Sequence, residues 1–527
     1  MTTKIDQRSA MSSESTIHRG TRVTVHERVT RYACYVLFLL VLLYTVNFID
    51  RQIMSILAED IKTDLKLDDS QLGFLYGTAF AIFYALFGIP LGRLADTWHR
   101  GRLIAIGLAT WSCMTVLSGL STTYAQLAAA RVGVGVGEAS ASPAAFSMLG
   151  GYFPASRRAL AAAIYSSGLY LGMGLSLPIG GHVSKAWNEA YSKGTAPYGF
   201  HGWQVAFMAV GLPGLLLAIW IWTLKDPPRL SGAPNAWHQF AMDLASVLPP
   251  FTLWSSSLYP GGLRVNILTL LTVGGICGGL AFMTGDKAQW IAYGVGLYSL
   301  LTWMRNLRFA DPPTHQLIWG TRGVCLAVVG FGCLAIVTYA FGFWAAPFAI
   351  RTYGVPAASV GSSLGIPGAI AAAIGVIVGG RLSDFWKQRD PRGRIFVGML
   401  SAALSAPAML AMFLASDFRH YAALSPIVYF CANLWAGSAV ATYQDFVLPR
   451  MYGTAGATYL IGSTMIGLAL GPYASGKVAA VTSSLQLGVF SLLVAPVVAI
   501  LVLWQVGRVA GEIERTKWAR AQAVGEP

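Results

Sequence analysis

Two pairs of opposite charges interrupt apolar stretches of the chain, where ionisable side chains are costly and mark candidate functional sites. Arg131 and Glu138 lie seven positions apart with three glycines between them, so a helix would present both on one face, about 10 Å apart. A carboxylate near a fixed cation changes its affinity for protons as water gains or loses access, which is the chemistry of proton coupling. The alternative is an ion pair that only fastens neighbouring helices.

The second pair, Asp50 and Arg51, lies in the outer part of the first apolar stretch. Successive residues on a helix diverge by about 100°, so neither is expected to be the other's only partner. Both could simply end the helix at the membrane interface, before the acidic loop 59–69. The mostly apolar residues 52–58 still follow, however, and this favours a functional site.

The elements that position these charges are membrane helices. Hydrophobic residues make up 55% of the 527 residues and charged residues only 11%, against about 25% charged in soluble domains. A span needs about 20 mostly apolar residues. Twelve such stretches are expected near residues 33–57, 71–92, 102–121, 124–147, 159–182, 203–224, 321–345, 357–381, 395–415, 422–446, 452–477 and 486–508.

The sequence therefore predicts an all-α polytopic membrane protein of two six-helix bundles with twelve core transmembrane helices. Its divisions are a cytoplasmic tail 1–32, a bundle 33–224, a central linker 225–320, a bundle 321–508 and a tail 509–527. The linker contains apolar runs at 266–285 and 288–304, which predict an inserted helical hairpin over 266–304. Because the second run is short, a re-entrant or surface-lying pair stays open. Residues 230–263 are expected to form an interfacial linker.

A similar sequence motif lies at the end of one apolar stretch in each half, at Gly92–Arg102 and again at Gly380–Arg394. Such duplication is typical of secondary transporters. A single basic cluster of this kind would only mark a cytoplasmic loop, but the duplication predicts a paired cytoplasmic gate. Its candidate residues are Asp96, Arg100, Arg102, Asp384, Lys387 and Arg389.

The distribution of positive charge predicts the orientation. With a cytoplasmic N-terminus, 27 of the 37 Lys and Arg residues fall on the cytoplasmic side, as the positive-inside rule requires. The net charge of +14 therefore reports topology and not a nucleic-acid partner. We expect an uncleaved first helix, both termini in the cytoplasm, and a monomer in a bacterial inner (plasma) membrane.

Other residues bear on the substrate and on excluded chemistry. Tyr339, Phe343 and Asn433 are polar or aromatic positions in later helices and are pocket candidates, although aromatics near helix ends more often form the interfacial belt. The six cysteines have no CxxC or His spacing, so we expect neither a disulfide nor a metal site. Motifs of zinc peptidases, P-loop proteins and Ser or Cys hydrolases are missing, so no enzyme and no cofactor are expected.

The Asp96 and Asp384 loops resemble the signature loop of the major facilitator superfamily. The phrases around Asp50–Arg51 and Arg131–Glu138 are similar to the spinster-like branch, a family of sphingolipid and lysolipid transporters. This resemblance implies a major facilitator fold with a central cavity, and proton coupling by Asp50 and Glu138. It also makes Arg51 and Arg131 charge partners or substrate ligands; Ser140 and Ser142, just after Glu138, join Arg51 as candidate substrate-binding residues.

Two departures from the family pattern weaken parts of this transfer. Thr97 replaces the basic residue that usually follows the loop aspartate, and the fifth helix lacks a glycine immediately before Pro178, which weakens any inference of antiport. The inserted pair at 266–304 is outside the usual twelve-helix plan.

We accordingly predict a proton-coupled secondary active transporter that moves an amphipathic or lipid-like molecule by alternating access, with protons, membrane lipids and the small substrate as its partners. The alternatives are a drug or organic-anion exporter of the same superfamily, a non-transporting sensor, and a passive lipid scramblase. Hydrophobic-cation cargo would favour the exporter, a long ordered cytoplasmic domain the sensor, and independence from a proton gradient the scramblase.

Overall fold

The structure is a computed structural model that describes residues 29–526 apart from 155, 193–195 and 228–235. Most of the predicted N-terminal tail therefore lies outside the described residues. The regular elements of the described part are all helical, as the long apolar runs predict. Twelve helical stretches in it are long and apolar enough to cross a membrane; they include 262–284, from the central region, but not 124–152, which is the fourth span of the first half.

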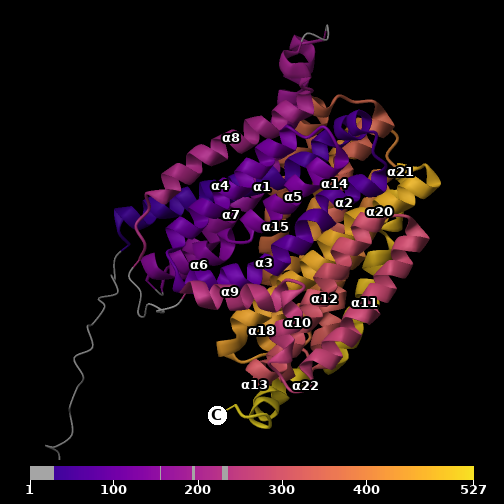
Figure 1. Cartoon of the computed structure of the whole chain (residues 1–527). Coiled ribbons are helices and arrows are strands. Elements are labelled where there is room, and N and C mark those ends of the chain that lie inside the picture. The colour runs from indigo at the N-terminus through magenta and orange to yellow at the C-terminus, as the bar shows by residue number, and fades with distance from the viewer. Residues whose placement is uncertain (1–28, 155, 193–195, 228–235, 527) are drawn as a thin grey trace, which may run out of the picture.

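The first half forms a six-helix bundle, drawn in indigo to magenta in Figure 1. Two of its six spans are broken, at Gly77 and at Ala139–Ser140. Its helices are α1 (Arg31–Leu65), α2 (Asp69–Tyr76) with α3 (Thr78–Thr97), α4 (Arg100–Gly119), α5 (Tyr124–Glu138) with α6 (Ala141–Tyr152), α7 (Arg158–Ala190) and α8 (Gly202–Trp222), with the 3-10 turn η1 (Pro197–Gly199) before α8.

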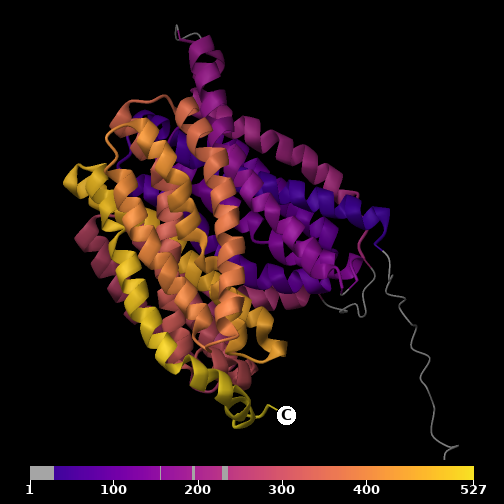
Figure 2. The same ribbon diagram turned by 180° about the vertical axis from the view of Figure 1, so that it is seen from behind.

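The second half forms a matching bundle, drawn in orange to yellow in Figure 2. A π-helical segment, η3, interrupts its fifth span just before Pro472. Its elements are α14 (Arg322–Tyr353), α15 (Ala357–Lys387), α16 (Gly393–Phe413), α17 (Phe418–Asn433) with α18 (Trp435–Asp445), η2 (Pro449–Met451), α19 (Tyr452–Ile461), η3 (Gly462–Leu468) with α20 (Ala469–Thr482), and α21 (Leu485–Ser491) with α22 (Val494–Gln522).

Between the halves the chain forms five more helices. They are α9 (Ala236–Val247), α10 (Phe251–Ser257), α11 (Gly262–Thr284), α12 (Lys287–Ala310) and α13 (Pro312–Ile318). The stretch expected to be an interfacial linker thus contains α9 and α10. Helices α11 and α12 form an antiparallel hairpin of 23 and 24 residues, so each is about 35 Å long, enough in length to cross a bilayer, but only α11 is also apolar enough to do so. This architecture confirms the prediction of two six-helix bundles with an inserted hairpin.

The hairpin packs against the line where the two halves meet. Figure 1 shows α12 next to the bundle and α11 outside it. Gly296 of α12 faces Ile82 of α3 and Met465 of η3, so the helix contacts both halves. Asp286, in the turn between α11 and α12, accepts hydrogen bonds from Ser70 of the first half at 3.2 Å and Tyr473 of the second at 2.8 Å.

The two ends of the bundle differ in how the halves meet. We call the end where α1 begins and α22 ends the terminal end, and the opposite end the Arg351 end. Between the halves, Gln52 donates to the carbonyl of Gly342 at 2.7 Å, and Ser55 donates to that of Phe343 at 2.6 Å. These contacts lie toward the Arg351 end, and the helices of the two halves diverge toward the terminal end (Figures 1 and 2).

Candidate functional site

Arg51 of α1 is the centre of the charged site. Its Nη2 atom lies 2.5 Å from Oε2 of Glu138, at the end of α5, and both side chains are buried. The guanidinium also faces three aromatic rings, with centroids at 4.7 Å for Phe48, 4.4 Å for Phe80 and 5.2 Å for Tyr84. Cation–π contacts are strongest where the cation is removed from water, so this cage stabilises a positive charge inside the membrane protein.

The length of α1 explains the depth of this site. The helix continues for fifteen residues beyond Asp50, to Leu65, which is about 22 Å of further rise. Asp50 and Arg51 therefore lie near the middle of α1 and do not end it. The helix continues past residue 57, the predicted boundary, through the acidic stretch 59–65 that was expected to lie in a loop.

Glycines of α5 bring Glu138 to Arg51. A Cβ atom on Gly135 would lie 2.5 Å from the carbonyl oxygen of Phe80, and one on Gly137 would lie 2.7 Å from the backbone nitrogen of Trp111. Only a residue without a side chain allows α5 to approach α3 and α4 this closely. The glycines between Arg131 and Glu138 thus allow the close packing on which the Arg51–Glu138 contact depends.

Asp50 faces a different environment from its neighbour Arg51. Its side chain is fully buried beside the side chains of Trp111 and Thr115, and neither carboxyl oxygen makes a well-formed hydrogen bond in the described part of the chain. Arg131, also fully buried, donates to the backbone carbonyl of Asp50 at 3.5 Å, and its Nε and Nη2 atoms are unpartnered there as well. Such unmet buried groups are uncommon and are typical of sites whose partners change.

Hydroxyl and aromatic side chains surround the charged cluster. Tyr44 stacks on Tyr165 with a centroid separation of 4.5 Å, and Ser142 of α6 lies beside the Tyr44 hydroxyl. Tyr339 of α14 approaches Arg51 from the second half. The predicted residues Arg51, Ser142 and Tyr339 are thus brought to one region that both halves contribute to.

Three other pocket candidates lie elsewhere. Ser140 donates to the carbonyl of Gly137 at 3.0 Å and packs against Gly107 of α4. Asn433 donates to the carbonyl of Tyr429 in its own helix at 2.8 Å. Phe343 stacks on Tyr76 of the first half at 4.4 Å, within the contact between the halves.

Sequence reasoning missed several residues of the site. Gln52 accepts from the hydroxyl of Tyr76 at 2.8 Å and connects it to the second half through the carbonyl of Gly342. Its place directly after Asp50 and Arg51 was an available signal. Phe80 and Tyr84 share a helix face by their four-residue spacing, but nothing in that spacing indicates a cation partner.

An ion-pair network joins the halves at the Arg351 end. Arg351 of α14 donates to Glu59 at 2.7 Å and to Asp69 at 2.9 Å, and Lys62 donates to Asp69 at 2.6 Å. Nothing along the chain indicates that Arg351 meets these acidic residues of the other half.

At the terminal end, the predicted gate residues of the first half contact their own half. Arg100 donates to Ser147 at 2.8 Å, and Ser147 donates to Asp96 at 3.4 Å. The Arg102 guanidinium lies over the ring of Trp222 at 5.7 Å.

The second copy repeats this behaviour. Asp384 pairs with Arg394 at 3.2 Å, and Lys387 pairs with Glu514 at 2.6 Å. Arg389 lies over the ring of Phe385 at 3.6 Å. In the part of the chain that the structure describes, no ion pair or hydrogen bond joins the two copies of the repeat; the contacts above lie within one half in each case.

A clamp that sequence analysis did not anticipate adds to the first copy. Arg93, inside the repeated phrase, pairs with Asp243 of α9 at 2.5 Å, and Trp98 contacts Trp237 edge-on with centroids 5.1 Å apart. Burial raises the pKa of Asp243 above its ordinary range, and the Arg93 charge opposes this rise. Helix α9 is thus fastened to the terminal end of α3.

The site has the components of a charge relay and not of a metal centre. Two carboxyl groups, Asp50 and Glu138, lie among two guanidinium groups in a water-poor environment, with aromatic and hydroxyl groups beside them. Within the described residues no group of three or more His, Cys, Asp or Glu side chains could hold a metal ion.

Comparison with known proteins places the chain among membrane transporters. Residues 40–472 match the family described as Major Facilitator Superfamily. An MFS-type efflux pump of Mycolicibacterium smegmatis is 25% identical over 438 residues, covering 83% of this chain and 82% of that protein. A probable galactarate/D-glucarate transporter of Bacillus subtilis is 28% identical over 235 residues, which cover 43% of this chain and 48% of that protein.

A solved structure gives a similar result for the whole fold. A bacterial homolog of the human lysosomal transporter Spinster, in an inward-facing and unoccupied conformation, is 25% identical, with a TM-score of 0.65 over 93% of this chain and 98% of that one. The same kind of protein in an occupied inward-facing state gives a TM-score of 0.63. The resemblance to the spinster-like branch, which was predicted from the motifs around Asp50–Arg51 and Arg131–Glu138, is confirmed.

Proposed function

Because the chain belongs to the major facilitator superfamily, we propose that it is a proton-coupled secondary active transporter for an amphipathic or lipid-like molecule, of the lysolipid or sphingoid type. It is an integral membrane transporter and not an enzyme. The observation that carries the proposal is the buried Arg51–Glu138 pair, with the fully buried carboxyl group of Asp50 close to it.

Glu138 is the proposed primary proton site. Its Oε2 atom accepts from Arg51, and the side chain of Asn47 lies beside the carboxyl group; Oε1 is buried and makes no well-formed hydrogen bond in the described part, so a proton can add to Oε1. Protonation removes the negative charge, and a hydrogen bond between an ion pair is about twice as strong as a neutral one. The interaction of Glu138 with Arg51 therefore weakens, and the Arg51 guanidinium becomes available to an anionic group of the substrate.

Asp50 and Arg131 form the proposed second step. Arg131 bonds the backbone of Asp50, so a small movement of α5 relative to α1 would bring the guanidinium to the Asp50 carboxyl oxygens. As the two halves move relative to each other, Asp50 would release its proton and form an ion pair with Arg131. Protonation is coupled to movement because each carboxyl group, Asp50 or Glu138, binds its arginine more strongly when it is ionised than when it is protonated.

The groups around Arg51 suit a molecule with an anionic end and an apolar body. Arg51 would hold the anionic end, and Ser142 and Tyr339 offer hydroxyl groups. The stacked rings of Tyr44 and Tyr165 provide an apolar wall beside them. Ser140, Phe343 and Asn433 remain candidates for substrate contact in other conformations.

Alternating access would use the two ends in turn. The Arg351 network holds the Arg351 end closed, and it must break before that end can open. We propose that the repeated clusters then meet as a gate at the terminal end: Asp96, Arg100, Arg102, Asp384, Lys387 and Arg389. One proton crossing 100 mV supplies about 2.3 kcal/mol, similar to the about 1.5–3 kcal/mol of one hydrogen bond to a charged group.

The proposed setting is a bacterial inner membrane, with both termini in the cytoplasm and the transporter acting as a monomer. The excess of Lys and Arg in the segments of the terminal end supports this orientation. The conformation would then be inward-facing, like that of the Spinster homolog.

Export of drugs or organic anions is the second candidate. The efflux pump of Mycolicibacterium smegmatis is similar over most of its length, and the sugar-acid transporter of Bacillus subtilis over about half of it. Two buried arginines would also suit a carboxylate substrate. The identity of the transported molecule therefore distinguishes the lipid transporter from the exporter better than the coupling mechanism does.

The test is transport into proteoliposomes under an imposed pH gradient, with a fluorescent lysophospholipid and with labelled glucarate. Wild type is compared with Glu138→Gln and Asp50→Asn. Glu189→Gln is the matched control, because Glu189 is an exposed carboxylate of the same half whose ion pair in the described chain is with Lys185, at 3.7 Å.

We expect gradient-stimulated lysolipid movement in wild type and the control, and loss of the stimulation in both site variants. Movement that ignores the gradient and survives both substitutions would contradict proton coupling and indicate passive lipid transfer. Gradient-driven glucarate movement without lysolipid movement would contradict the lipid cargo and favour the organic-anion alternative.

A further inference from the structure

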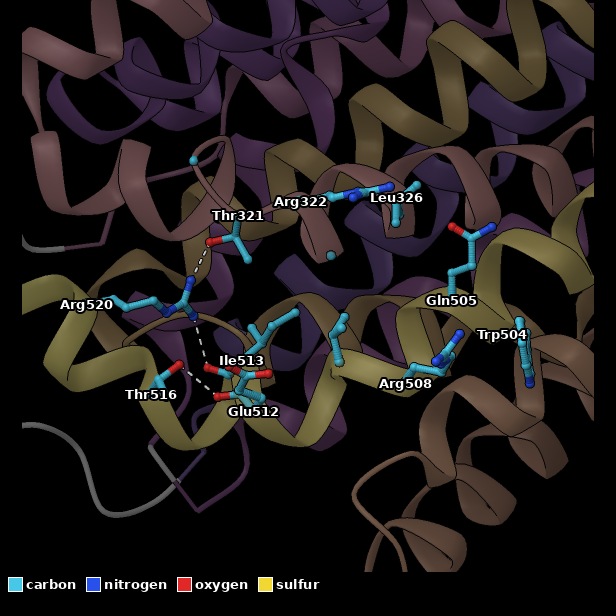
Figure 3. A pocket seen from close by; sticks show the side chains of 13 residues that line it. Thr321, Arg322, Leu326, Trp504, Gln505, Arg508, Glu512, Ile513, Thr516 and Arg520 are labelled. Atoms are coloured by element: carbon cyan, nitrogen blue, oxygen red, sulfur yellow. Dashed lines mark hydrogen bonds between the residues drawn. The ribbon is translucent and has the colours of Figure 1, made fainter.

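A basic groove lies on the outer surface of the second half, far along the chain from the charged site. It is formed by the start of α14 and the last turns of α22 and has a cavity volume of about 670 Å³ (Figure 3). Arg322 comes from α14, and Arg508 and Arg520 come from α22. Arg508, Glu512, Thr516 and Arg520 are four residues apart in succession, so they share one face of α22.

The arginines are only partly satisfied by the protein. Arg520 donates to the Thr321 hydroxyl at 2.5 Å and to the carbonyl of Ile513 at 3.0 Å, and its buried Nε has no partner in the described chain. Arg322 and Arg508 are exposed. Glu512 is the one carboxylate of the lining, and no ion pair between it and these arginines occurs among the described residues. Net positive charge therefore remains for an anionic ligand.

An apolar stripe continues from the groove along α22. Val494, Val497, Leu501 and Trp504 are each more than half exposed, and their spacing of three or four residues aligns them on one face. The stripe leads to Arg508, whose guanidinium lies 5.2 Å from the Trp504 ring centroid. Tryptophan is enriched where the hydrocarbon core meets the headgroups, and this places the basic groove at headgroup level.

We propose that this groove binds an anionic phospholipid. The lipid phosphate would lie between Arg322 and Arg508, where guanidinium groups match phosphate geometry, and one acyl chain would follow the stripe past Trp504 and Leu501. Basic pockets between helices at the cytoplasmic side are typical sites for anionic headgroups. The apolar stripe favours a lipid over free phosphate, because a soluble anion gains nothing from it.

The site is separate from the proposed transport pathway. The stripe residues Val494, Val497 and Leu501 are exposed on the bundle surface, whereas Arg51 and Glu138 are buried in the first half. A bound lipid would join the start of α14 to the end of α22. We therefore expect it to stabilise the second half without being transported.

The test is native mass spectrometry and thermal unfolding of the delipidated full chain with added phosphatidylglycerol, phosphatidylcholine or inorganic phosphate. Variants are Arg322→Gln with Arg508→Gln, and the control is Arg515→Gln, an exposed arginine of α22 outside the groove lining. Each lost arginine should weaken phosphatidylglycerol binding about fivefold, so the double variant should bind roughly 25-fold more weakly.

We expect phosphatidylglycerol, but not phosphatidylcholine or phosphate, to raise the unfolding temperature of wild type and the control. Equal binding by the double variant would overturn the proposal, as would an equal effect of phosphatidylcholine. An equal effect of phosphate alone would reduce the groove to a soluble-anion site and would also overturn it. Comparable unfolding temperatures of all variants without lipid would separate a lost site from a lost fold.

Discussion

Arg51 donates to Glu138 across 2.5 Å inside the first bundle, with the faces of three aromatic rings around the guanidinium. A buried ion pair is weak evidence for stability, because removing both charges from water costs about as much as their attraction returns. The depth of this pair therefore supports the proposal that it takes part in proton coupling. Its geometry also makes the two partners unequal, since three aromatic rings surround the Arg51 guanidinium, whereas Glu138 interacts with Arg51, Arg131 and the side chain of Asn47.

The inequality predicts different effects of two substitutions at Glu138. Glu138→Ala leaves Arg51 buried without its partner and should lower the free energy of unfolding by about 3–5 kcal/mol, at most, because the rings keep part of the stabilisation. Glu138→Gln keeps an acceptor and should cost clearly less while abolishing coupling. Thermal unfolding in detergent checks the order, and equal losses for Ala and Gln would contradict it.

Gly135 offers a test of how α5 is positioned. Gly135→Ala places a methyl group 2.5 Å from the carbonyl oxygen of Phe80, and since backbone cannot swing aside, α5 must shift. We expect a loss of about 1–3 kcal/mol in stability and a loss of coupling. Gly150→Ala in α6 is the control, because a Cβ atom there meets nothing within 4 Å. Wild-type behaviour of the Gly135 variant would show that close packing of α5 is dispensable.

The apolar runs, the duplicated phrase and the charges within helices predicted the fold class and brought Asp50, Arg51, Arg131 and Glu138 forward as candidates. They did so because membrane solvation constrains composition strongly over each span. The resemblance made Arg51 and Arg131 charge partners, but it did not say which arginine pairs with which acid, since the contact of Arg51 with Glu138 joins residues 87 positions apart and depends on helix packing. The same limit hid the contact of Arg351 with Glu59.

Substitution of Arg351 should change how often the Arg351 end is open. Arg351→Gln removes its charged contacts with Glu59 and Asp69, so the Arg351 end should open more often, with a shift of the closed-to-open ratio by roughly tenfold or more. Spin-label distances between α1 and α14 near that end measure the shift. Lys185→Gln is the control, because Lys185 pairs only within its own helix. An unchanged distance distribution would contradict a role of Arg351 in closure.

The C-terminal segment should depend on pH. Arg450 donates to Glu526 and to Asp311, at 3.0 Å for Asp311. These contacts lower the pKa of Glu526; burial alone would raise the pKa of Asp311, but the hydrogen bonds from Arg450 and Thr314 outweigh it. Because both folded pKa values lie below the unfolded ones, the stabilisation is complete above about pH 4.3 and is lost as pH falls through the folded values.

Hydrogen exchange of the backbone at the end of α22 measures this release. We expect protection at pH 6 and a steep loss in the acid range in wild type, after correction for the intrinsic rate. Arg450→Gln should show low protection at both pH values, because its carboxylates have lost their cation. Protection that is independent of pH in wild type would indicate that this ion-pair cluster does not hold the C-terminal segment.

The contacts of helix α9 should limit the movement of α3 at the terminal end. Arg93 pairs with Asp243 at 2.5 Å and Trp98 packs on Trp237, so α9 must move together with the end of α3. Asp243→Asn removes the charge of the pair and should release α9, seen as at least a tenfold rise in hydrogen exchange over 236–247. Asp390→Asn, in a loop of the second half, is the control. Unchanged exchange would mean that the tryptophan contact alone holds α9, and Trp237→Ala would then be required for release.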